Sequence, residues 1–202
     1  MVVNESLGIP KINRMLLDVF NYNLANELEG MDIVANWWNN SGHEPSEIGR
    51  HYTRENLNML PLFMRDTAVF FNDAFHDEQV AGAALELFTR QNIRALAVLP
   101  LFLGTRQIGV LLLESEELHD FTQDEIRLFT AMGPQIATVL ENRRQFERAQ
   151  KQAERESTLN IISQKIQSAT TVEAVLQIAA RELGHALGAP MTIAQLSMKD
   201  KK

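Results

Sequence analysis

Five histidines are the residues of this sequence whose side chains could bind a metal ion or exchange protons near neutral pH. No two of them show the H-x-x-x-H or H-E-x-x-H spacing that places two ligands on one face of a helix. A zinc site is therefore not expected. One histidine precedes an aspartate, at 119–120, in a segment typical of a solvated turn. The five are His43, His51, His76, His119 and His185.

Other patterns of catalytic residues are missing from the sequence. No serine stands in a G-x-S-x-G context, no glycine-rich phosphate-binding loop is present, and there is no cysteine to serve as a nucleophile or thiolate ligand. The aspartates fit turns and helix caps, with Asp77 a candidate N-cap for a helix over 78–91. We therefore expect that this chain is not an enzyme.

Composition and charge narrow the class of protein. With 202 residues, of which 45% are hydrophobic and 22% charged, the chain has room for one globular domain and an appendage. The net charge of −7 disfavours nucleic acid and anionic membranes as partners. No apolar run reaches the roughly 18 residues of a membrane span, and no signal-peptide pattern opens the chain. These features predict a cytoplasmic location and no membrane segment.

A hairpin is the clearest sheet element in the sequence. Residues 95–103 and 108–113 are apolar runs of strand length, and Gly104 begins the short turn between them. Glycine adopts the backbone angles that such turns require. The two runs are therefore predicted to pair as antiparallel strands.

A long helix is predicted to follow the hairpin. Thr122 and Glu125 have the spacing of a capping box, in which each side chain accepts a hydrogen bond from the other residue's backbone amide. Few helix-breaking residues follow until about residue 168. Because Pro134 removes one helical hydrogen bond, we expect a bend near residue 130.

The run PLFLGTRQIGVLLL at 100–113, followed by FTQDE at 121–125 and QIATVLEN at 135–142, resembles the C-terminal half of a GAF domain. Upstream segments fit the same family, and the resemblance covers roughly residues 10–147. These upstream segments are three candidate strands, at 15–22, 31–38 and 67–73, and a helix before residues 92–94. The resemblance implies an α+β fold, a GAF-like antiparallel sheet with helices on both faces, followed by the long helix and an additional amphipathic helix.

The family resemblance implies a ligand pocket between the sheet and the helices and loops on its far face. Two adjacent tryptophans end the second predicted strand, and because successive strand residues point to opposite faces, only one of them can face the pocket. Aromatic and histidine side chains of nearby segments are the other candidates, although aromatic residues there also suit an ordinary core. The candidate pocket residues are Trp37, Trp38, His43, His51, Tyr52 and Phe70.

The resemblance also bears on which cofactors are expected. The chain has no cysteine of the kind that anchors a bilin in photoreceptor relatives. The cyclic-nucleotide subgroup has an Asn-Lys pair and three residues between a Phe and an Asp-Glu pair. This chain has no Asn-Lys pair and only two residues between Phe121 and Asp124, which disfavours cyclic nucleotides. Haem bound through a loop histidine stays open.

A four-residue repeat predicts how the chain is divided into domains. Leu-Gly-Ile-Pro at 7–10 recurs as Leu-Gly-Ala-Pro at 187–190. The second copy follows a predicted amphipathic helix over 171–187, which begins with a capping box at 170–173. We interpret the chain as a window from a tandem array, although both pieces also suit ordinary helix ends. The predicted divisions are a GAF-like domain at 10–147 that lacks its opening helix, a helical linker at 148–168, and the opening helix and first strand of a following GAF-like domain at 169–202.

The long helix carries a sparse apolar seam that suits a second chain. Val139, Phe146, Ala149 and Ala153 recur at heptad-like spacing within an otherwise polar stretch. We expect a homodimer, with helix 171–187 packed in its own chain or exchanged with the partner. The function implied is a non-catalytic sensory module of a bacterial-style signalling protein. It binds a small molecule or partner and relays this binding through the long helix to an output domain. The alternative is a dimerising spacer with a filled pocket.

Overall fold

The structure is a computed structural model, and it describes residues 11–186. The described chain forms two compact units, with the boundary between Glu141 and Asn142. Helix α4 (Gln123–Ser168) contributes residues to both. No helix in the described range has the length and apolar character needed to cross a membrane.

The first unit is built on one antiparallel sheet of six strands in the order β3-β2-β1-β6-β5-β4. The predicted hairpin is confirmed: β5 and β6 pair from Ala95 opposite Ser115 to Leu103 opposite Arg106, around Gly104 at a φ of +62°. The strands are β1 (Arg14–Tyr22), β2 (Leu28–Trp38), β3 (His51–Thr53), β4 (Val69–Phe71), β5 (Ala95–Leu103) and β6 (Arg106–Ser115).

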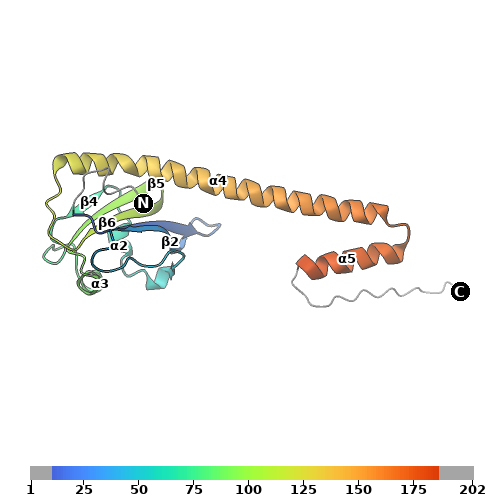
Figure 1. Cartoon of the computed structure of the whole chain (residues 1–202), viewed down its shortest axis with the longest axis horizontal. Coiled ribbons are helices and arrows are strands. Elements are labelled where there is room, and N and C mark those ends of the chain that lie inside the picture. The colour runs from blue at the N-terminus through green and yellow to red at the C-terminus, as the bar shows by residue number, and fades with distance from the viewer. Residues whose placement is uncertain (1–10, 187–202) are drawn as a thin grey trace. The chain divides into compact units, whose positions relative to one another are not determined.

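Helices cover both faces of this sheet, as Figure 1 shows, so the expected α+β fold is confirmed. The short helix α2 (Leu60–Phe63) and α3 (Ala83–Gln91) lie on one face, and the first part of α4 crosses the other. A 3-10 turn, η1 (Arg54–Asn56), follows β3.

Each face of the sheet has its own apolar layer. One layer joins the sheet to α2 and α3 and contains Phe20, Phe63 and Phe88. The other joins the sheet to α4 and contains Leu99 and Phe129. Alternating side chains along each strand belong to the two layers in turn, because strand side chains point to opposite faces.

The start of α4 is confirmed in atomic detail. The backbone amide of Thr122 donates to Oε2 of Glu125 at 2.8 Å, and the amide of Glu125 donates to Oγ1 of Thr122 at 3.3 Å. Phe121 is buried against the same layer as the half-buried Ile126. The helix is assigned without a break through Pro134.

The prediction of a helix over 78–91, with Asp77 as its N-cap, is wrong at its start. Helix α3 begins only at Ala83, after Gly82 at a φ of +56°. The Asp77 side chain accepts from the amide of Gln79 at 2.9 Å and so forms a local turn. Aspartate stabilises such turns and helix caps through the same side-chain acceptor, so the sequence did not distinguish them.

In the second unit, α5 (Val172–Ala186) forms where an amphipathic helix is predicted. Its cap lies one residue later than predicted, because Thr171 Oγ1 accepts from the amide of Ala174 at 3.2 Å. Lys165 of α4 and Glu182 of α5 form an ion pair of 2.6 Å. Both copies of the Leu-Gly-x-Pro repeat, and the strand predicted to follow the second, lie outside the described residues. The tandem-array interpretation and the exchange of helix 171–187 stay predictions.

Candidate functional site

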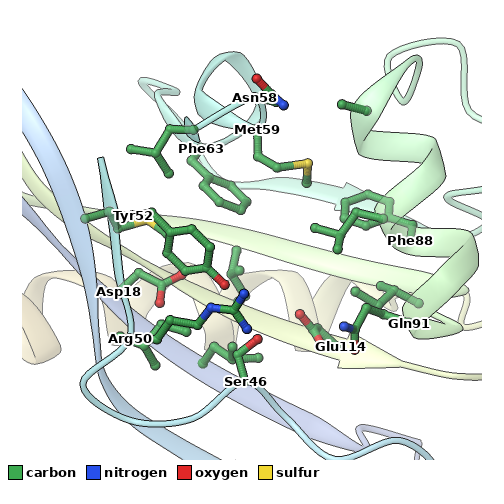
Figure 2. A pocket seen from close by; sticks show the side chains of 18 of the residues that line it. Asp18, Ser46, Arg50, Tyr52, Asn58, Met59, Phe63, Phe88, Gln91 and Glu114 are labelled. Carbon is green, nitrogen blue, oxygen red and sulfur yellow. The ribbon is translucent and has the colours of Figure 1, made fainter. Parts of the chain in front are cut away.

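A cavity of about 370 Å³ lies between the sheet and the elements on the α3 side. Strands β1, β2, β5 and β6 form its floor, and the β2–β3 loop, β3, the segment after η1 and α3 form its walls (Figure 2). Its lining combines apolar side chains with many polar and charged ones, among them Asp18, Arg50 and Glu114. Such a mixture is typical of small-molecule sites, where apolar walls bury the ligand and polar groups orient it.

Asp18 is a buried carboxyl on the floor of this cavity. Its side chain belongs to β1, where it is flanked on the same face by Leu16 and Phe20, and the residue is only 2% exposed. Its Oδ1 is buried and has no hydrogen-bond partner among the described residues. Burial, and to a smaller extent the nearby Glu114, raises the pKa of Asp18 to about 7.

A second buried carboxyl on the floor, Glu114 of β6, is paired. Nε of Arg14 donates to its Oε2 at 2.8 Å, and the guanidinium also donates to the carbonyl oxygens of Gln91 at 3.0 Å and His43 at 3.2 Å. Burial raises the pKa of Glu114, while the Arg14 charge opposes this shift. Arg14 therefore ties β1, β6, the end of α3 and the β2–β3 loop together at one end of the cavity.

The β2–β3 loop is fixed at the same end by Glu116. Its Oε1 accepts from the amide of His43 at 2.6 Å, and its Oε2 accepts from the side-chain amide of Asn92 at 3.1 Å. Partial burial works to raise the pKa of Glu116, but these hydrogen bonds and the charge of Arg14 hold it below its usual value. Gly42 in this loop has a φ of +72°, and a Cβ there would overlap the Glu116 carboxylate.

Tyr52 and Arg50 form another wall of the cavity. The guanidinium carbon of Arg50 lies 5.1 Å from the centre of the Tyr52 ring, within the range of a cation–π contact. Tyr52, Phe63 and Phe88 present aromatic rings around the cavity in Figure 2. The walls can therefore contact a flat, largely apolar ligand.

Of the six residues proposed from the sequence, the structure places Tyr52 in the lining of this cavity. Trp37 and Phe70 pack against the other layer, with α4, so they face away from it. Three more lie in polar contacts outside the lining. Trp38 donates its indole N–H to the carbonyl oxygen of Ser41 at 2.8 Å, the His43 ring lies 3.1 Å from Glu116, and the His51 ring lies 2.6 Å from Asp32.

The histidines also bear on a metal or haem site. Within the described part of the chain, no three His, Asp or Glu side chains gather to hold a metal ion. No histidine is among the residues that line the cavity. The cavity therefore offers carboxylates, a phenol, a hydroxyl, amides and thioethers but no imidazole, which does not fit a haem held through histidine.

The four seam residues of α4 are all exposed. Val139 and Phe146 are 66% and 70% exposed, and Ala149 and Ala153 are exposed as well. Phe146 is the most exposed of the large apolar side chains on α4, and an exposed side chain of this kind suits a contact surface. The expectation of a homodimer through this seam stays a prediction.

Sequence reasoning missed Asp18, Arg14 and Glu114, the polar groups of the cavity floor. A signal was present in the predicted first strand, where Arg14, Leu16, Asp18 and Phe20 alternate. Charged residues that share one strand face with buried apolar residues indicate a polar group in the interior. The partner strand that holds Glu114 lies about 100 residues away, and only the sheet order brings the two carboxyls together.

Comparisons with known proteins agree with this architecture. A family model described as the GAF domain matches residues 38–141. No curated protein matches the sequence. Among solved structures, the GAF domain of a two-component sensor histidine kinase from Bacillus halodurans is 14% identical with a TM-score of 0.53, over 71% of this chain and 91% of that one.

Two photoreceptor structures have the same fold. The blue-light-absorbing form of the PixJ GAF domain from Thermosynechococcus elongatus is 17% identical with a TM-score of 0.53, over 75% of this chain and 85% of that one. Bacteriophytochrome RpBphP3 from R. palustris is 9% identical with a TM-score of 0.59, over 88% of this chain and 40% of that one. At such low identities these likenesses are of fold.

Proposed function

Because the chain belongs to the GAF domain family, we propose that it is a non-catalytic sensory module of a signal-transduction protein, binding a small molecule in the cavity and relaying its presence through α4. The parent protein is of a bacterial type and carries the output domain elsewhere. Solved relatives come from a sensor histidine kinase and from photoreceptors, which supports a role in signalling.

The observation that carries this proposal is the unpartnered carboxyl of Asp18 in the cavity. A buried carboxyl without a hydrogen bond costs free energy, and an apolar residue would pack at this position at lower cost. Its neighbours on the same strand face, Leu16 and Phe20, are apolar and buried. A ligand that completes the hydrogen bonding of this carboxyl accounts for its presence.

The sheet supplies a physical route from the cavity to α4. On β1, Leu16 and Asp18 face the cavity while Met15 and Leu17 pack in the layer that contains Phe129 of α4. Helix α4 also lies close to β5, where a Cβ built at Gly133 would lie 3.5 Å from the carbonyl oxygen of Pro100. A ligand that prefers one position of β1 therefore also favours one arrangement of α4.

A second candidate function is a dimerising spacer, and the exposed apolar seam of α4 favours it. In a spacer, Phe146 of this seam contacts a second chain whether or not the cavity holds a ligand. The two functions differ in one property. A spacer has no ligand that changes its stability or its helix, whereas a sensor does.

Mass spectrometry and spectroscopy of the purified chain test the proposal directly. We expect a small molecule to be released on denaturation, or, if the chain purifies empty, a screen of small molecules to yield compounds that raise the melting temperature. An absorbance spectrum of the native protein reports haem or another chromophore. A chain that releases nothing and gains no stability from any compound would support the spacer.

A blocking variant shows whether binding uses the cavity. Leu87 of α3 lines the cavity and is only half buried, so Leu87→Trp should fill part of the space without disrupting the core. Binding should be lost in this variant and kept in Glu47→Gln, which changes an exposed side chain of the β2–β3 loop outside the lining. Equal binding by Leu87→Trp and the unmodified chain would place the ligand elsewhere.

A further inference from the structure

Asp18 also indicates the chemical class of the ligand, an inference that rests on the proposed function. The backbone fixes the direction of this side chain. In the pairing of β1 with β2, Leu17 lies opposite Ala35 and Asp18 opposite Ile33, so an additional residue bulges from β2 at this point. Bulges of this kind redirect side chains and are frequent beside functional sites.

Strand β6 holds Asp18 in place from the other side. A Cβ at Gly109 would overlap the carbonyl oxygen of Asp18, so the close approach of the two strands requires a glycine here. The Asp18 side chain then points to the cavity beside Tyr52 in Figure 2. Two irregular backbone features thus place the Asp18 carboxyl on a floor whose other carboxyl, Glu114, is paired with Arg14.

The charged groups around the cavity leave the Asp18 carboxyl without a counter-charge. Arg14 lies on the same strand, but its donors contact Glu114, Gln91 and His43. The other charged residues in the lining are Arg50 and Arg90, both exposed, and the exposed carboxylate of Glu86. No ion pair is found between Asp18 and any cation of the described chain. Arg50 instead stacks on Tyr52.

The missing counter-charge has an electrostatic consequence. Burial of the Asp18 carboxyl, and to a smaller extent the negative charge of Glu114 nearby, disfavour the ionised form and raise the pKa of Asp18 to about 7. A positive group beside Oδ1 reverses this effect and favours the carboxylate. A negative group beside Oδ1 makes the ionised form of Asp18 still less favourable, so the floor discriminates against anionic ligands.

We propose that Asp18 is the recognition residue for a cationic nitrogen ligand, and that its Oδ1 accepts a hydrogen bond from a protonated N–H group on a small, flat, largely apolar molecule. Aryl amidines and protonated heteroaromatic amines belong to this class. The rings of Tyr52, Phe63 and Phe88 contact the apolar body, and the charge-assisted hydrogen bond on the floor sets the orientation.

Calorimetry with three matched compounds tests the ligand class. Benzamidine, benzamide and benzoate share one ring and carry a cationic, a neutral and an anionic group. We expect benzamidine to bind at least tenfold more tightly than the other two, and its affinity to rise between pH 6 and pH 8 as Asp18 becomes ionised. Equal or stronger binding of benzamide or benzoate, or no binding of benzamidine, overturns the proposal.

Two variants assign the effect to Asp18. Asp18→Asn keeps the shape of the side chain and removes its charge, so it should lower the affinity for benzamidine at least tenfold and abolish its rise with pH. Glu47→Gln removes a carboxylate from an exposed position of the β2–β3 loop, outside the lining. It should change neither the affinity for benzamidine nor the rise of that affinity with pH. Unchanged benzamidine binding by Asp18→Asn overturns the proposal.

The failure of this inference can be told from failure of the proposed function. A neutral or anionic compound that binds the chain, is blocked by Leu87→Trp and binds Asp18→Asn equally well would retain the sensory module and exclude the cationic class. If no compound of any charge binds in the cavity, both the ligand class and the sensory function fail together.

Discussion

Arg14 and Glu114 form a buried ion pair across neighbouring strands, with 2.8 Å between Nε and Oε2 and side-chain exposures of 1% and 8%. The two residues are also direct partners in the pairing of β1 with β6. The remaining donors of the guanidinium contact the carbonyl oxygens of Gln91 and His43 and, at 3.5 Å, Oε1 of Glu116. This pair therefore connects the sheet to the loop and helix that enclose the cavity.

Arg14→Met should destabilise the first unit by about 3–5 kcal/mol, because it leaves the Glu114 carboxylate buried without a counter-charge. Both tryptophans of the chain, Trp37 and Trp38, lie in β2, so tryptophan fluorescence during urea unfolding follows this unit alone. The double variant with Glu114→Met should recover much of the loss.

Arg127→Ala is the control for this experiment, because Arg127 is 78% exposed and its contact with Asp124 is 3.8 Å long. Exposed pairs of this kind contribute little, so the change should stay within about 0.5 kcal/mol. If Arg14→Met is as mild as the control, the buried pair does not hold the cavity together.

Asp18→Asn should stabilise the empty chain, and more so as the pH rises. The pKa of Asp18 is about 7 in the folded chain and about 3.8 when unfolded, so the folded state holds its proton more tightly. The free energy of unfolding contributed by Asp18 therefore falls as pH rises from about 4 to 7, by up to about 4 kcal/mol.

The measurement is urea unfolding of both chains at several pH values between 4 and 8. The difference between Asp18→Asn and the unmodified chain should grow over this range and level off above pH 7, while Glu47→Gln should show no such trend. A difference that is constant with pH would mean that Asp18 is already ionised in the folded chain at low pH.

Gly109→Ala should destabilise the sheet by about 1–3 kcal/mol, because its Cβ would overlap backbone atoms of Asp18 and force β1 and β6 apart. The variant should also lower the affinity of any ligand whose binding depends on the direction of the Asp18 side chain. Unfolding and calorimetry with benzamidine measure the two effects.

Gly133→Ala is the matched control, because a Cβ at this position of α4 makes only ordinary contacts, 3.5 Å from Pro100. Alanine is a better helix former than glycine, so this variant should be neutral or slightly stabilising. Similar losses in both variants would show that close backbone approach is not what Gly109 provides.

Phe146→Glu should convert a dimer to a monomer, since a charge on the apolar seam of α4 is unfavourable between two helices. Analytical ultracentrifugation measures the mass in solution. Lys151→Glu is a control on the same helix, because residue 151 is exposed and lies off the seam. A monomer before and after Phe146→Glu would mean that the seam is not an interface.

Elements whose signals are local could be predicted from the sequence. The capping box of Thr122 and Glu125 works over three residues, and the hairpin around Gly104 over about a dozen, so both were predicted correctly. The start of α3 was not, because Asp77 forms a turn with the same side-chain acceptor that would cap a helix. The family and the α+β fold followed from the order of these local elements.

Which side chains form the cavity depends on long-range pairing of the strands and could not be predicted from local patterns. The register of β1, β2 and β6 turned Trp37 toward α4 and Asp18 toward the cavity, and a bulge opposite Asp18 changed the alternation on β2. Whether Oδ1 of Asp18 has a hydrogen-bond partner depends on all the side chains packed around it, from Leu16 to Glu114. Long-range pairing creates that environment, and no local pattern of residues encodes it.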